Sequence, residues 1–97
     1  MSYTVEATYT KPADKQWFAQ VHPGLAQRYR KVDRARAVGM INRTVNQVNE
    51  NTVVVTSTWN SEADYQAFLA KRGASVADAV RSDYGRTNGI TVTTRIV

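Results

Sequence analysis

Residues 51–70 read NTVVVTSTWNSEADYQAFLA, and their hydrophobic period changes at one point. Up to Trp59 the segment is rich in β-branched residues, which is typical of a strand. Directly afterwards Ser61 is a good helix N-cap, and with Asp64 three positions later it approximates a capping box. The stretch therefore predicts a strand over 52–59 that runs straight into a helix, with the tryptophan at the junction.

The helix that follows this junction presents one regular face, made of Tyr65, Phe68, Leu69 and Arg72. Gly73 is expected to end it as the C′ residue, because glycine accepts the left-handed conformation. Ser75 is then expected to cap a second helix, whose apolar stripe runs to Gly85. The dipeptide Asn88-Gly89 is a turn signal, and a last strand is predicted over 90–97.

In the N-terminal half, polar and apolar residues first alternate and then follow a helical pattern. Residues 2–9 predict a strand with one buried face. We expect a helix to open at residues 10–12, where Pro12 suits a first turn, and to bend or divide at Pro23-Gly24. Residues 35–48 are extended in character, with Gly39 as the expected bulge, and a turn at 49–51 makes a hairpin with the strand 52–59.

The predicted order of elements is β-α-β-β-α(α)-β, within a single domain over 1–97. Its most economical packing is a ferredoxin-like α+β sandwich, in which a four-stranded antiparallel sheet carries the helices on one face. Strand parity places Trp59 on the helix-covered face and leaves the other face rich in threonine. Threonine is a good strand former in solvent, but such a face also suits packing against a second copy.

Composition excludes several classes of function. Thirteen basic and eight acidic residues give a net charge of +5, which mildly favours anionic partners. The absence of cysteine excludes disulfides, thiolate metal sites and cysteine nucleophiles. No apolar run is long enough for a membrane span, and the N-terminus does not read as a signal peptide, so a cytoplasmic location is the default expectation.

The strand that ends in Trp59, followed by an acidic-capped helix with Tyr-x-x-Phe, resembles the dimeric α+β barrel superfamily. Within it the sequence is most similar to antibiotic-biosynthesis-monooxygenase-like domains. This resemblance implies a ferredoxin-like protomer, a homodimer formed by sheet pairing, and a ligand cavity between sheet and helices. It also implies a small-molecule-binding function with a small hydrophobic or aromatic ligand, and cofactor-independent oxygenation of an aromatic or acyl substrate is one form of it.

The haem-degrading branch of that superfamily has an Asn, a Trp and a His at three defined places. The corresponding residues here are Ala7, Phe68 and Asp78, so haem degradation is rejected and no cofactor is expected. One histidine without cysteine offers no convergent set of metal ligands either.

Two sets of residues are candidates for chemistry. His22 is the only histidine and is a weak candidate for a general base, although a lone His beside Pro-Gly is more often a surface residue. Aromatic residues at helical spacing are usually core, but four of them could also line a ligand pocket between the sheet and the helices. These four are Trp59, Tyr65, Phe68 and Tyr84.

The segment 28–36, RYRKVDRAR, keeps a nucleic-acid alternative open, because it holds five basic side chains around Tyr29. The strand 52–59 lacks the aromatic platform on which RNA-recognition domains stack bases, so a solvated helix end explains the run more simply. A third alternative is a non-catalytic homodimeric module with a filled core. A cavity that reaches Trp59 and His22 would favour ligand binding over that module.

Overall fold

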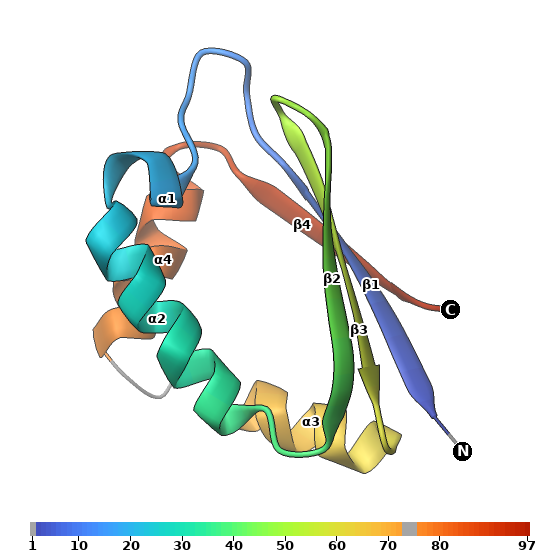
Figure 1. The fold of residues 1–97 in the computed structure, drawn as a ribbon. Coiled ribbons are helices and arrows are strands. Elements are labelled where there is room, and N and C mark those ends of the chain that lie inside the picture. The colour runs from blue at the N-terminus through green and yellow to red at the C-terminus, as the bar shows by residue number, and fades with distance from the viewer. Residues whose placement is uncertain (1, 73–75) are drawn as a thin grey trace.

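A computed structural model of the chain describes residues 2–72 and 76–97. The elements are β1 (Tyr3–Thr10), α1 (Phe18–Val21), α2 (Pro23–Arg36), β2 (Met40–Asn49), β3 (Thr52–Trp59), α3 (Glu62–Lys71), α4 (Val76–Thr87) and β4 (Thr91–Ile96). The strands form one antiparallel sheet in the order β2-β3-β1-β4, and the helices all lie on one side of it (Figure 1). This is the predicted ferredoxin-like α+β sandwich.

The register of the sheet confirms which residues face the helices. Tyr3 pairs with Trp59 and Ala7 with Val55, so these positions share one face of β1 and β3. Ala7 also pairs with Thr94 of β4, which continues the same row. The opposite face carries the threonines of both central strands, and the hydroxyls of Thr4 and Thr58 lie 3.3 Å apart on it.

The prediction that a helix opens at residues 10–12 is wrong, because α1 begins only at Phe18. The intervening loop instead docks on the β2–β3 turn. Lys11 donates from its backbone N–H to the Asn51 carbonyl (2.9 Å) and from Nζ to Asn51 Oδ1 (2.8 Å), while Trp17 Nε1 donates to the Glu50 carbonyl (3.0 Å). Long-range contacts with the hairpin thus override the local helix signal at Pro12.

The division at Pro23 is confirmed, since His22 ends α1 and Pro23 stands at the start of α2. Two expectations further along are wrong. Helix α2 continues to Arg36, where an extended segment was expected from residue 35. Gly39 has φ of +89° in the turn before β2, while the register of β2 and β3 shifts between Met40 and Asn42 and again between Gln47 and Asn49. The glycine is therefore needed for the turn and not for the bulge.

Helix α3 begins as predicted, because Ser61 Oγ accepts a hydrogen bond of 3.2 Å from the Asp64 backbone N–H. The expected C′ residue Gly73 and cap Ser75 lie outside the described residues. Helix α4 passes through Gly85 and ends at Thr87, two residues later than predicted. Glycine without a positive φ does not stop a helix, and here the turn residue is Gly89 at φ +69°.

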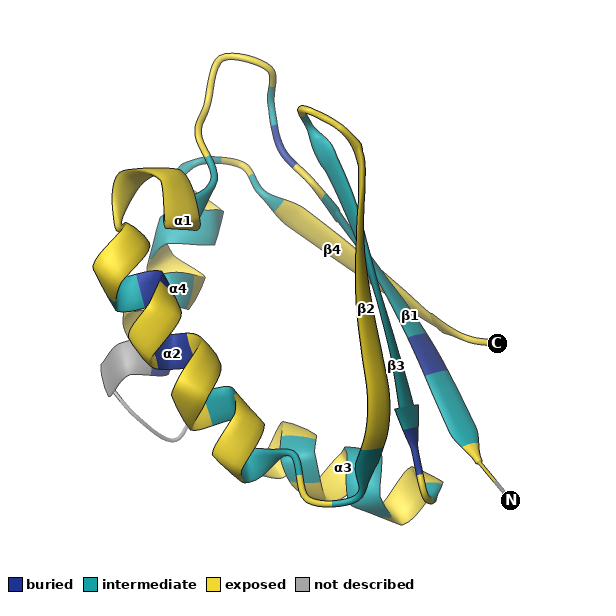
Figure 2. Ribbon diagram, in the orientation of Figure 1, coloured by how far each residue is buried: buried dark blue, intermediate teal, exposed yellow. Residues whose placement is uncertain are grey.

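Two aromatic clusters organise the packing, and they lie at different places on the helical layer. In one, Phe18 stacks on Tyr29 (centroids 5.7 Å apart) and meets Tyr84 edge-on (5.4 Å), which joins α1, α2 and α4. In the other, Trp59 contacts Tyr65 and Phe68, which joins β3 to α3. Buried residues are few, and most of the surface of both layers is exposed or half-buried (Figure 2).

An ionic network ties α2 to α4 without involving the sheet. Arg81 binds both Asp33 (2.8 Å) and Asp78 (2.7 Å), and Arg36 binds Asp78 at 2.9 Å. The accessible surface of the chain is 6417 Å², against roughly 5,500 Å² for a compact monomer of this mass. The ion pairs thus join the two helices, and the larger surface indicates that the chain as a whole is packed loosely.

Candidate functional site

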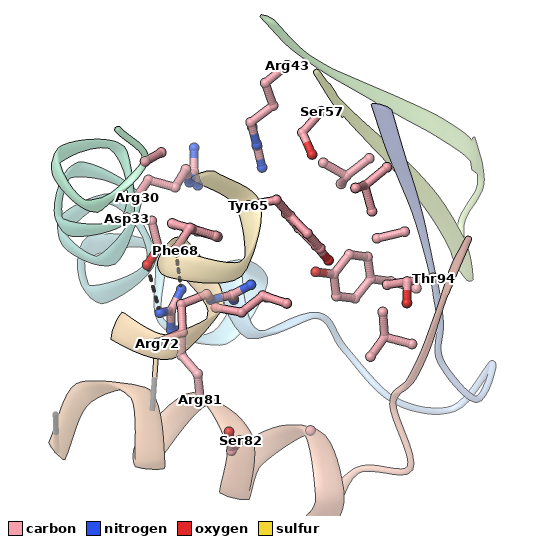
Figure 3. A pocket seen from close by; sticks show the side chains of 18 of the residues that line it. Arg30, Asp33, Arg43, Ser57, Tyr65, Phe68, Arg72, Arg81, Ser82 and Thr94 are labelled. Carbon is pink, nitrogen blue, oxygen red and sulfur yellow. Dashed lines mark hydrogen bonds and ion pairs between the residues drawn. The ribbon is translucent and has the colours of Figure 1, made fainter. Parts of the chain in front are cut away.

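A cavity of about 1,030 Å³ lies between the sheet and the helices. Its floor comes from the helix-facing residues of the central strands, among them Val5, Ala7 and Val55. Its walls come from one face of α2, from α3, and from the C-terminal part of α4. Figure 3 shows these side chains converging on one space from both layers.

The apolar end of the cavity is built at the β3–α3 junction. Trp59 is 1% exposed, and its ring centroid lies 5.5 Å from that of Tyr65 and 5.1 Å from that of Phe68. Its indole N–H donates to Ser57 Oγ at 3.0 Å. Because Ser57 satisfies this buried donor, the tryptophan is fixed in one orientation and forms a rigid wall.

Tyr65 contributes a hydroxyl to the same space. Burial raises the pKa of its phenol above the ordinary value of 10.0, with further increases from Tyr3 and Tyr9 and an opposing effect of Arg72. A phenol with a raised pKa stays protonated at neutral pH, so Tyr65 is available to donate a hydrogen bond to a ligand.

The polar lining of the cavity is dominated by arginine. Six of the nine arginines line it, against one acidic residue, Asp33, and none of the four lysines. The lining therefore has a net charge of +5, equal to that of the whole chain, and the remaining residues balance at seven basic and seven acidic side chains. By residue count the lining is therefore strongly basic, although Asp78 and Asp83 from outside the lining bind two of its arginines.

Three of these arginines are already engaged. Arg81 is held by Asp33 and Asp78, Arg86 pairs with Asp83, and the guanidinium of Arg72 lies 5.5 Å from the centroid of the Phe68 ring. The other three are Arg30, Arg34 and Arg43. Within residues 2–72 and 76–97, no carboxylate oxygen lies within 4.0 Å of their nitrogens.

The structure brings together three of the four aromatic candidates, since Trp59, Tyr65 and Phe68 all line the cavity. Tyr84 does not, and its hydroxyl donates to the Gln16 carbonyl at 2.6 Å. His22 also lies outside the lining, exposed, with its ring 5.2 Å from Phe18 and 6.3 Å from Tyr84. His22 and Tyr84 thus belong to the aromatic cluster among the helices.

Sequence reasoning did not single out the arginine side of the cavity. The heptad-like spacing of Arg30, Asp33, Arg34 and Ala37 on one helical face was a usable signal, because a pair at i and i+4 points the same way. Arg43 was harder to place. It pairs with Ser57 and therefore faces the helices, but the irregularity between Met40 and Asn42 breaks the alternation that would have revealed it.

The described part of the chain has neither a metal-binding cluster nor a helix suited to a membrane. It contains no group of three or more side chains suited to hold a metal ion. None of its helices has both the length and the apolar character needed to cross a membrane.

No protein-family model and no curated protein matches the sequence. Solved structures do match. SnoaB, a cofactor-independent oxygenase from Streptomyces nogalater, is 14% identical with a TM-score of 0.64 over 99% of this chain and 90% of that one. A NIPSNAP family protein from Agrobacterium tumefaciens is 15% identical, with a TM-score of 0.68 over 100% and 91% of the two chains.

A third structure, described as a "putative antibiotic biosynthesis monooxygenase" from Nitrosomonas europaea, is 10% identical with a TM-score of 0.66 over 99% and 88% of the two chains. At such identities the likeness concerns the fold alone. The fold that this chain shares with the three structures agrees with the fold that the sequence resemblance implied.

Proposed function

We propose that this protein binds a small organic molecule in the cavity between its sheet and its helices. The supporting observation is the cavity itself, whose volume of about 1,030 Å³ is at the upper end of the range of roughly 300–1,000 Å³ typical of ligand pockets. Its lining combines an aromatic end at Trp59 and Phe68 with a few hydroxyls and many guanidinium groups. Such a mixture suits a ligand that is apolar in part and polar in part.

The cavity argues against a non-catalytic module with a filled core. A filled core would close the space above Val5, Ala7 and Val55, whereas all three line the cavity. The cavity reaches Trp59 but not His22, so the binding proposal does not rest on the histidine.

Nucleic-acid binding is less well supported than ligand binding, because the basic side chains of residues 28–36 do not form one surface. Arg30 and Arg34 line the cavity, while Arg36 binds Asp78 and lies close to Asp33. Only part of the run thus remains for a phosphate backbone to follow, and an extended basic stripe is what such binding requires.

A cofactor-independent oxygenation is the second candidate function. It is supported by the name of the Streptomyces nogalater protein and by the cationic lining, which would stabilise an ionised, electron-rich substrate. Oxygen uptake by the purified chain with a panel of electron-rich phenols, measured with an oxygen electrode, tests this candidate separately from binding.

The binding proposal is tested with a neutral fluorescent probe, N-phenyl-1-naphthylamine, whose emission rises in an apolar site. We expect saturable binding to the wild-type chain. Ala7→Trp should weaken it by about tenfold or more, because the new side chain occupies the middle of the cavity floor. Ala63→Trp, on the exposed part of α3 outside the lining, is the matched control. Absence of saturable binding, or equal effects of both variants, would contradict the proposal.

A further inference from the structure

We infer that the ligand of this cavity is an organic anion, and that Arg30, Arg34 and Arg43 bind its charged group. This inference rests on the proposed binding function and adds the class of ligand to it. The charged group is a carboxylate, sulfonate or phosphate, attached to an apolar body that reaches the wall formed by Trp59 and Phe68.

The three arginines approach the cavity from both of its layers. Arg30 and Arg34 are four residues apart on α2, so their side chains leave the same face of that helix. Arg43 comes from β2, and its pairing with Ser57 directs it to the same space from the sheet side (Figure 3). A group placed between α2 and β2 would therefore meet guanidinium groups on two sides.

Among the residues that the structure describes, none forms an ion pair with these three groups. The only acidic residue in the lining is Asp33, and both of its oxygens are bound by Arg81 (2.8 and 3.3 Å). Like charges at i and i+4 on a helix destabilise it, and Arg43 adds a third cation to the same cavity from β2. A bound anion would remove this repulsion, whereas a neutral ligand would leave it in place.

The choice of arginine also matters. A cavity edge that needed only solubility could carry lysine, yet all four lysines lie outside the lining. The guanidinium group is planar and presents paired donors that match a carboxylate or phosphate, and it loses less hydration than an ammonium group on binding. A lining whose basic residues are all arginines is therefore suited to anion recognition.

The position of the apolar wall sets the shape of the ligand. Ser57, which pairs with Arg43, and Trp59 lie two residues apart on the same face of β3, a separation of about 7 Å. A ligand whose charged group lies beside Arg43 would thus place a two-ring apolar body against Trp59 without leaving the sheet floor.

Two probes with nearly the same body separate charge from shape. 8-Anilinonaphthalene-1-sulfonate carries a sulfonate that N-phenyl-1-naphthylamine lacks. Binding is measured by fluorescence titration of the whole chain. We expect Arg30→Gln/Arg34→Gln and, separately, Arg43→Gln to raise the dissociation constant of the sulfonate probe by about tenfold. The neutral probe should change by less than about twofold in the same variants. Its unchanged binding also shows that the variants are folded.

The control variant is Arg28→Gln/Lys31→Gln, which makes the same charge change on α2 at exposed positions outside the lining. If it weakens binding of the sulfonate probe as much as Arg30→Gln/Arg34→Gln does, the probe responds to the overall positive charge of the protein, and the inference is overturned. Equal responses of both probes to the arginine variants also overturn it, while the binding function stands. If neither probe binds the wild-type chain, the binding function itself fails. Competition by 2-naphthoate and by 1-naphthyl phosphate, but not by 2-naphthamide, is expected and identifies the preferred charged group.

Discussion

At the scale of single residues, Trp59 connects the fold to the site. It ends β3, is almost fully buried, and packs against Tyr65 and Phe68 of the next helix. Its polar atom needs a partner inside the protein, and Ser57 provides one from two residues earlier on the same face. The aromatic wall of the cavity is thus held by a hydrogen bond within one strand.

Ser57→Ala should lower the free energy of unfolding by about 1–2 kcal/mol, because it leaves the buried indole N–H without an acceptor. Urea unfolding followed by circular dichroism measures this change. In a Trp59→Phe background the same substitution should cost close to nothing, since phenylalanine has no donor to satisfy. An equal cost in both backgrounds would mean that Ser57 stabilises the fold by another contact.

At the scale of elements, the helices are held by different means. Helices α1, α2 and α4 are joined by the Phe18 cluster and by the ionic network around Asp33 and Asp78. Helix α3 instead follows directly from β3 and is fixed to it by the Trp59 cluster. The cavity lies between these two anchor points, so the position of α3 determines one wall of it.

Ser61→Ala should destabilise the protein by about 1 kcal/mol and reduce binding of the neutral probe, because it removes the N-cap of α3. Thermal unfolding and probe titration measure the two effects. Ser61→Asp keeps an acceptor at the cap and should behave like the wild type. A stable Ser61→Ala variant with full probe binding would show that the β3–α3 packing alone positions this helix.

At the scale of the whole molecule, charge and burial are unevenly distributed. The cavity lining is basic by residue count, and the opposite face of the sheet is rich in threonine, with an ion pair between Arg95 and Glu6 (2.8 Å). The accessible surface is also larger than that of a compact monomer of this mass. A threonine-rich face suits packing against a second copy, and this packing stays our prediction from the sequence.

Sedimentation at micromolar concentration should accordingly give a dimer. Thr56, at the middle of the outer face between Thr44 and Glu6, is the position to test. Thr56→Arg should shift the population toward monomers, because it would place a long charged side chain between the two sheets. Thr87→Arg, at the exposed end of α4, is the control. A wild-type monomer under these conditions would contradict the proposal.

Much of the fold could be read from local patterns. The strand 52–59, its junction with a capped helix and the division at Pro23 depend on residues close together in the sequence, and all three are confirmed. The helix expected from residues 10–12 fails for the converse reason. Lys11 and Trp17 bind the turn at 50–51, more than thirty residues away, and no local pattern contains that contact.

The same distinction between local patterns and long-range contacts applies to the candidate site. The sequence by itself determined the aromatic side, since strand parity and helical spacing bring Trp59, Tyr65 and Phe68 to one space. Only the tertiary structure decided that Tyr84 packs among the helices and that Arg43 of β2 lines the same cavity as Arg30 and Arg34. The physical reason is that periodicity fixes which way a side chain points from its own element, while the separation of the layers fixes what it meets.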